Sequence, residues 1–396
     1  MTARSHTKTV CYTIEGVNSF GVVLYFNYLY FFMRDRFGFD DKRNLLVAAL
    51  MGFVYVFAAW QGGKFGQQRG FFSALKVGFT LISTGLAGAW FADSAVGEIL
   101  AAMLVTVGTC FIWPSLEALV SEGESPARLP DAVGLYNVIW AITNALAFFV
   151  GGSFIGMFGY RVIFILPLAL ALAQLALVFW LHRHATEMAR QALKNLGAQP
   201  SPEPHRPASP QAKQFLRMAW LANPFAYIAI NTLIAVIPGI AAKFHLSTML
   251  AGVVCSLWCF VRLGAFVALW RWTGWHYRFR WLVTAFLLLI VSFAIILTAP
   301  NLPVLIAAQL VFGGAIGLIY YSSLFYSMDA SDTRGEHGGI HEAAIGAGNC
   351  LGPAAGAAAL WLAPQDASIG AWAVSGLLTL GFGGLLYIRR RRSVGG

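Results

Sequence analysis

A few ionisable side chains interrupt long apolar runs of this sequence, and they are the first candidates for chemistry. Glu15, Glu117 and Arg262 each lie within such a run, and the pair His341–Glu342 begins another. Ionisable groups are expensive in apolar surroundings, so each is by default a candidate for a functional site. Carboxyl and imidazole groups could exchange protons, while a guanidinium group could hold an anion.

Each of these residues also has a simpler interpretation. Glu15 could face a cavity or be hydrated near a membrane surface, and Glu117 could be a hydrated gate residue or a proton carrier at the bilayer midplane. Arg262 could extend its side chain to the surface, pair with Glu342, or bind an anionic solute. The His341–Glu342 pair could exchange protons, or Glu342 could favour the positive end of a helix.

Neutral polar and aromatic side chains, spaced so that they share helix faces, form a second set of candidate site residues. Amide and aromatic groups together suit a polar organic solute, although a single Asn can instead hold two helices together. With Arg262, the predicted solute-binding or charge-partner residues are Asn18, Tyr30, Trp113, Asn137, Trp140, Asn144, Tyr227, Asn231, Gln309, Tyr320 and Asn349.

The elements that must position these residues are membrane-spanning helices. The chain is 58% hydrophobic and 11% charged, and apolar stretches of about 20 residues are long enough to cross a bilayer. The apolar runs are broken by Gly and lack strict alternation, which favours helices over a barrel. Twelve spans are predicted, at 10–33, 44–62, 72–92, 98–121, 131–156, 160–181, 215–241, 247–270, 281–299, 302–327, 338–363 and 368–388.

A polar, Pro-rich insert divides these spans into six before it and six after it. It predicts three parts: a six-helix bundle over 1–182, a cytoplasmic linker over 183–214 and a second six-helix bundle over 215–396. Such an insert cannot bury a core and should act as a solvated tether. Lys and Arg are concentrated in segments on the side of both termini, which predicts cytoplasmic termini, here in a bacterial inner membrane. The net charge of +10 then reflects topology and lipid headgroups, and nucleic acid is not expected as a partner.

Two glycine patterns refine this interpretation. The loop between the second and third spans contains Gly63, Gln67, Arg69 and Gly70, and the eleventh span contains Gly348-x-x-x-Gly352-Pro353-x-x-Gly356. With twelve spans and a central cytoplasmic loop, the chain resembles the major facilitator superfamily over essentially its whole length. Gln67 stands where that family has an Asp that helps to lock a gate, so a charged latch is in doubt and a neutral one stays open. The Gly-Pro pattern is typical of the fifth span of drug:proton antiporters, whose Arg in the fourth span is missing here.

The resemblance implies two pseudo-symmetric bundles that work by alternating access on a small organic solute, as a monomer. We expect a secondary active transporter, coupled to protons through Glu15, Glu117, His341 or Glu342. The alternatives are proton symport or facilitated uptake of a sugar- or nucleoside-like solute, and a non-transporting membrane sensor or scaffold. Phosphate-binding loops and metal-ligand spacings are absent from the sequence, so no enzyme activity, cofactor or metal is expected.

Overall fold

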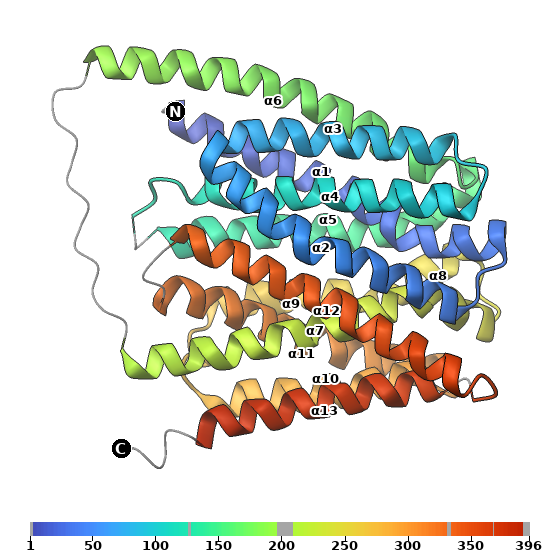
Figure 1. Cartoon of the computed structure of the whole chain (residues 1–396). Helices are drawn as coiled ribbons and strands as arrows, with labels where there is room; N and C mark the ends of the chain where they lie inside the picture. Colours follow the sequence, from blue (N-terminus) through green and yellow to red (C-terminus); the bar gives the residue numbers. More distant parts are fainter. Residues whose placement is uncertain (1–2, 126–127, 196–208, 331–333, 367, 391–396) are drawn as a thin grey trace.

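The computed structural model describes residues 3–125, 128–195, 209–330, 334–366 and 368–390. Side chains are described over fewer residues, and those of 3–6, 185–195, 328–330 and 334–341 lie outside them. All regular elements of the described chain are α-helices, which lie roughly along one common axis (Figure 1). The predicted all-α membrane fold is therefore confirmed.

The helices follow the predicted spans closely. The first half contains α1 (Ala3–Phe37), α2 (Asp41–Arg69), α3 (Phe71–Trp90), α4 (Ala95–Ser121), α5 (Leu129–Phe158) and α6 (Val162–Asn195). The second half contains α7 (Pro210–Lys243), α8 (Thr248–Cys255), α9 (Leu257–Arg271), α10 (Phe279–Thr298), α11 (Leu302–Ala330), α12 (Arg334–Leu362) and α13 (Ile369–Arg390). Helices α1–α6 form the first half of the chain, and helices α7–α13 form the second half.

Several boundaries differ from the prediction. The helices α2 and α6 continue to Arg69 and Asn195, past their predicted ends at 62 and 181, so the first residues of the predicted linker are helical. The eighth span is not one helix, because the helical bonding is interrupted at the buried Ser256 between α8 and α9. The helix α7 begins at Pro210, so the last residues of the predicted linker are helical. Ser209 caps this helix by accepting a hydrogen bond from the backbone of Ala212, and Pro210 fits the first helical turn, where its missing N–H is not needed. Residues 196–208, with most of the linker prolines, lie outside the described residues.

Eleven stretches of the described residues are long and apolar enough to cross a membrane, counting α8 and α9 as one, and α1 is not among them. The reason lies in its buried polar side chains, since Glu15, Asn18, Ser19 and Asn27 are all less than a tenth exposed. These groups face protein and not lipid, so α1 can be polar and still lie inside the bundle.

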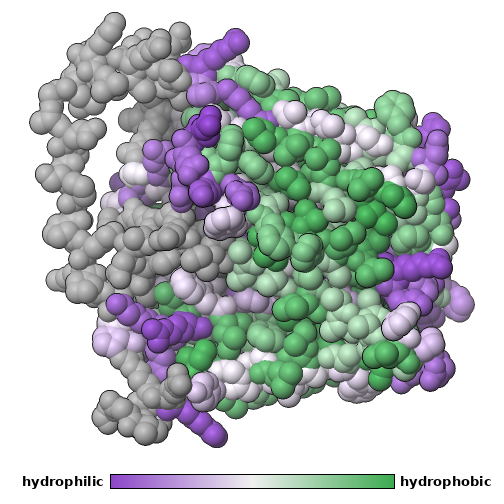
Figure 2. Space-filling view, in the orientation of Figure 1, coloured by the Kyte–Doolittle hydropathy of each residue, from purple (hydrophilic) through white to green (hydrophobic). Residues whose placement is uncertain are grey.

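The outer surface matches a bilayer. Apolar side chains form a broad band across the visible face and polar ones gather at the two ends (Figure 2). Large apolar residues lie exposed in this way on many helices, for example Phe53, Phe57, Leu172 and Leu380. A soluble monomer rarely shows such a continuous apolar surface, whereas a lipid environment covers it.

The two halves pack together most closely on the side away from the termini, where the α1–α2 connection lies (Figure 1). A Cβ atom at Gly52 in α2 would collide with the backbone of Asn349 and Cys350 in α12. In the same way, Gly152 in α5 lies directly against the start of α8, and Gly239 in α7 lies against the carboxyl group of Asp41. Glycine permits these close approaches because it has no side chain to separate the helices.

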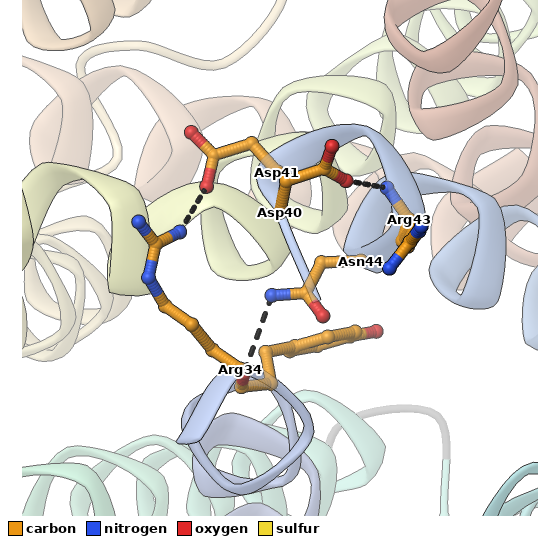
Figure 3. Close-up of polar contacts among 6 residues, drawn as sticks. Arg34, Asp40, Asp41, Arg43 and Asn44 are labelled. Atoms are coloured by element: carbon orange, nitrogen blue, oxygen red, sulfur yellow. Dashed lines mark hydrogen bonds and ion pairs between the residues drawn. The ribbon is translucent and has the colours of Figure 1, made fainter. Parts of the chain in front are cut away.

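Figure 3 shows how the α1–α2 connection is fixed at this side. Arg34 Nη1 lies 3.1 Å from Asp41 Oδ1, and Asp40 caps α2 by accepting a hydrogen bond of 2.9 Å from the backbone N–H of Arg43. Asn44 donates its amide to the backbone carbonyl of Tyr30. The turn itself uses Gly38, whose φ of 66° is strained for other residues. These contacts hold Asp41 where α7 meets it.

Candidate functional site

A cavity of about 190 Å³ lies between the two halves. Its wall comes from α1, α2, α4 and α5 on one side and from α7, α9, α11 and α12 on the other. It contains eleven of the sequence-predicted residues: Tyr30, Trp113, Glu117, Trp140, Asn144, Tyr227, Asn231, Arg262, Tyr320, Glu342 and Asn349. The protein thus brings together side chains that are more than 300 residues apart in the sequence.

Glu15 does not line the cavity but lies directly behind its wall. It is fully buried, and its carboxyl group accepts a hydrogen bond of 2.6 Å from the Ser19 hydroxyl and one of 2.8 Å from the Tyr136 hydroxyl. Tyr136 itself lines the cavity. One hydroxyl group therefore connects the Glu15 carboxyl group to the cavity.

Glu342 takes part in a hydrogen bond between the two halves. It lies at the wall on α12 and is buried, and it accepts a hydrogen bond from the Tyr55 hydroxyl of α2. The side chain of His341, its predicted companion, lies outside the described residues. Glu117 lines the cavity from α4, half-buried, and its carboxyl group makes no hydrogen bond or ion pair with the described side chains.

Arg262 is buried in α9, with 3% of its surface exposed. Its guanidinium carbon lies 4.4 Å from the ring centre of Trp140 and 5.0 Å from that of Trp258, so the cation makes cation–π contacts with two indole rings. The pairing with Glu342 that the sequence left open is not formed. Across the described residues, the ion pairs are Lys8–Glu124 and Arg34–Asp41, both away from the cavity.

An aromatic stack continues the wall beside Arg262. Trp140 of α5 stacks on Tyr320 of α11 with ring centres 5.5 Å apart and planes 13° apart. Phe266, one turn after Arg262 in α9, stacks on the same tyrosine at 5.5 Å. The stack joins helices of both halves, and its members Trp140 and Tyr320 give the cavity wall an aromatic, apolar part.

The amide groups separate into two sets. Asn144, Asn231 and Asn349 line the cavity, and Asn231 donates to Asn349 between α7 and α12. The others lie elsewhere: Asn137 donates to the Val133 carbonyl of its own helix, Gln309 is buried in α11 without a hydrogen-bond partner, and Asn18 faces a small separate cavity inside the first half.

Several lining residues were not predicted from the sequence. Tyr55 and Tyr136 matter because they donate to carboxyl groups on other helices, a relation that no spacing along the chain reveals. The sequence could have indicated Trp258, since it precedes Arg262 by four residues and so shares its helical face. Asn27, Thr106 and Thr109 complete the unpredicted polar lining.

The predicted gate loop and glycine pattern lie outside the cavity. Gly63 is half-buried near the end of α2, Gln67 and Arg69 are exposed there, and Gly70 forms the turn to α3 with a φ of 90°. No hydrogen bond of the Gln67 side chain appears among the described residues. The glycines Gly348 and Gly352 lie against the backbone of α7, Gly356 touches Leu45 of α2, and Pro353 is buried within α12.

Comparison with known proteins agrees with this architecture. The family model described as "Major Facilitator Superfamily" matches residues 11–353. No curated protein sequence matches the chain. Among solved structures, the chain is similar to the human organic anion transporter MFSD10 (TETRAN), with a TM-score of 0.67 and 16% identity, over 97% of this chain and 100% of that one. At this identity the similarity concerns the fold.

Proposed function

The chain belongs to the major facilitator superfamily, a family of membrane transporters, and on this basis we propose that it is a secondary active transporter. It would move a small organic solute through the central cavity by alternating access, coupled to protons. The observation that carries the proposal is the cavity itself, which lies between the halves and combines carboxyl groups, a buried arginine and aromatic rings. Transport of this kind needs neither a cofactor nor a metal.

Alternating access would use the contacts between the halves. The glycine contacts of α2 with α12 and of α5 with α8 join the halves on the side away from the termini. Separation of these helices would open the cavity there, and closure at the other end would complete the exchange. Because the Lys and Arg residues are concentrated near the termini, we place that other end in the cytoplasm of a bacterial cell, with the protein working as a monomer.

Proton coupling would act through the three glutamates around the cavity. The Tyr55–Glu342 hydrogen bond crosses from α2 to α12, so a proton that binds Glu342 would weaken the acceptor in a bond between the halves. Glu15 could exchange a proton with the cavity by way of Tyr136, and Glu117 could do so directly. Protonation of a glutamate at the cavity could in this way change the contacts between the two halves.

The alternative is proton symport or facilitated uptake of a neutral sugar- or nucleoside-like solute. The observation that favours it is the set of amide groups Asn144, Asn231 and Asn349 at the wall, since amides can donate to and accept from hydroxyl groups.

Flux through proteoliposomes tests the transport function. Solutes that raise the melting temperature of the purified protein would be selected first, then followed as labelled compounds with and without an imposed pH gradient. We expect accumulation that depends on the gradient. Binding without flux under any gradient would instead favour a sensor.

A further inference from the structure

Arg262 is a buried cation without an anionic partner. Its Nε and Nη2 atoms are both buried and have no hydrogen-bond partner in the structure. The two indole rings of Trp140 and Trp258 contact the guanidinium group, yet rings do not accept the in-plane N–H bonds. Unmet donors on a buried charged group are costly, so a partner from outside the protein is expected at this position.

The two unpartnered atoms define the shape of that partner. The Nε–H and one Nη2–H bond of a guanidinium group point in the same direction and form a fork. The two oxygens of a carboxylate group fit such a fork with parallel hydrogen bonds. Because both nitrogens are buried in this conformer, the Arg262 side chain would turn toward the cavity that it lines when the carboxylate binds.

The described carboxyl groups around the cavity do not take this role. Glu342 accepts a hydrogen bond from Tyr55, and Glu15 accepts hydrogen bonds from Ser19 and Tyr136. Neither carboxyl group, nor that of Glu117, lies within ion-pair distance of Arg262. The anion that completes the site must therefore enter with the solute.

The surroundings also limit the charge and the body of the solute. Arg262 is the single cationic residue at the described cavity wall, and Glu117 and Glu342 lie at the same wall. A second negative charge on the solute would meet carboxyl groups and no further cation. The rings of Trp140 and Tyr320 line the cavity beside Arg262 and provide apolar surface for the rest of the molecule.

We propose that the transported solute is a small organic monocarboxylate, whose carboxylate group binds the Nε–Nη2 edge of Arg262 and whose apolar body lies on the rings of Trp140 and Tyr320. This inference rests on the proposed function and names its substrate class. It excludes neutral sugars, organic cations and multiply charged anions as the preferred solutes.

Binding measurements on the purified protein test the substrate class. The probes are butyrate, benzoate and indole-3-acetate, each compared by calorimetry with its neutral amide and its amine. We expect at least one carboxylate to bind at least about tenfold more tightly than its amide, since a charged fork is lost in the amide. Equal binding of the amide, or preferred binding of the amine, would overturn the inference.

Two variants locate the binding site. Arg262→Lys keeps the charge but loses the fork, and should weaken carboxylate binding by about tenfold, while Arg262→Gln should abolish it. The control is Arg271→Gln, at the exposed end of the same helix, which should bind like the wild type. The melting temperature of each variant shows that it is folded. Unchanged carboxylate binding by folded Arg262→Lys and Arg262→Gln would place the anion elsewhere and contradict the proposal.

The same probes separate this inference from the transport function. If carboxylates bind through Arg262 but no solute crosses proteoliposomes, the transport function is wrong and the anion site stands. If the wild type and Arg262→Gln transport a neutral solute equally well, the transport function stands and the substrate class is wrong.

Discussion

At the scale of single residues, the three glutamates around the cavity have different surroundings. Glu15 is held by two hydroxyl groups behind the wall, Glu342 is held by a tyrosine of the opposite half, and Glu117 faces the cavity. A carboxyl group that carries the coupled proton must gain and lose it during the cycle, whereas a purely structural one need not. Substitution by glutamine separates these roles because it keeps the size and removes the proton exchange.

We predict that Glu15→Gln, Glu117→Gln or Glu342→Gln abolishes accumulation driven by a pH gradient while solute exchange at equal pH persists. The matched control is Glu98→Gln, because Glu98 is also buried in α4 but does not line the cavity. Labelled uptake over a range of external pH values measures the effect. Wild-type pH dependence in all three variants would remove the glutamates as proton carriers.

The Tyr55–Glu342 hydrogen bond gives a second prediction at this scale. Tyr55→Phe removes a hydrogen bond between the halves and leaves a buried carboxyl oxygen of Glu342 without its donor, which should lower the free energy of unfolding by about 1–3 kcal/mol. Tyr25→Phe is the control, since Tyr25 is equally buried but its hydroxyl group has no hydrogen-bond partner. The two melting temperatures are compared directly. A larger loss in Tyr25→Phe than in Tyr55→Phe would show that the bond contributes little.

At the scale of helices, the close contact of α2 with α12 depends on glycines, which have no side chain to hold the two helices apart. Gly52 lies against the backbone of α12 and Gly346 lies against the backbone of Val56 in α2. Backbone atoms cannot move aside as a flexible side chain can, so an added methyl group must separate the two helices.

Gly52→Ala should therefore destabilise this conformer by about 1–3 kcal/mol. Gly88→Ala in α3 is the control, because a Cβ atom there meets nothing within 4 Å and alanine favours helix. Thermal unfolding of the two variants in the same detergent measures the difference. Equal melting temperatures would contradict the close packing of α2 on α12.

The helices were largely predictable from the sequence, and the site was predictable in part. Bilayer thickness fixes the length of an apolar run, so every predicted span lies on a helix. The ends of α2 at Arg69 and of α6 at Asn195 lie beyond the apolar runs, and the interruption at Ser256 has no comparable signal. Arg262 was conspicuous because it breaks an apolar run. Its indole neighbour Trp140 and the Tyr136 donor to Glu15 come from other helices, and such pairings depend on packing that spacing does not encode.

At the scale of the whole molecule, the two halves meet around the cavity and are joined by contacts that alternating access would have to break. A covalent link between the halves should then stop transport, whereas a link within one half should not. The pair Leu45→Cys with Gly356→Cys joins α2 to α12 across the halves, and the pair Leu221→Cys with Gly384→Cys joins α7 to α13 within the second half. In both pairs a Cβ atom at the glycine would first meet the end of the leucine side chain that is replaced, so neither pair forces two helices apart.

In a background without the native cysteines, a short thiol cross-link of the Leu45–Gly356 cysteine pair should abolish uptake, and its cleavage by reduction should restore uptake. The Leu221–Gly384 cysteine pair serves as the control and should leave uptake unchanged in both states. Gel mobility after proteolysis between the halves reports the link across the halves, and labelling of the remaining free thiols in the denatured protein reports the link within one half. Full uptake by the fully linked Leu45–Gly356 variant would contradict alternating access between the halves.

Uptake of a labelled monocarboxylate by proteoliposomes under an imposed pH gradient tests the central claim most directly. The account predicts accumulation by the wild type that disappears when the gradient is removed, and little accumulation by Arg262→Gln. A folded wild-type protein that moves no solute under any gradient would contradict it.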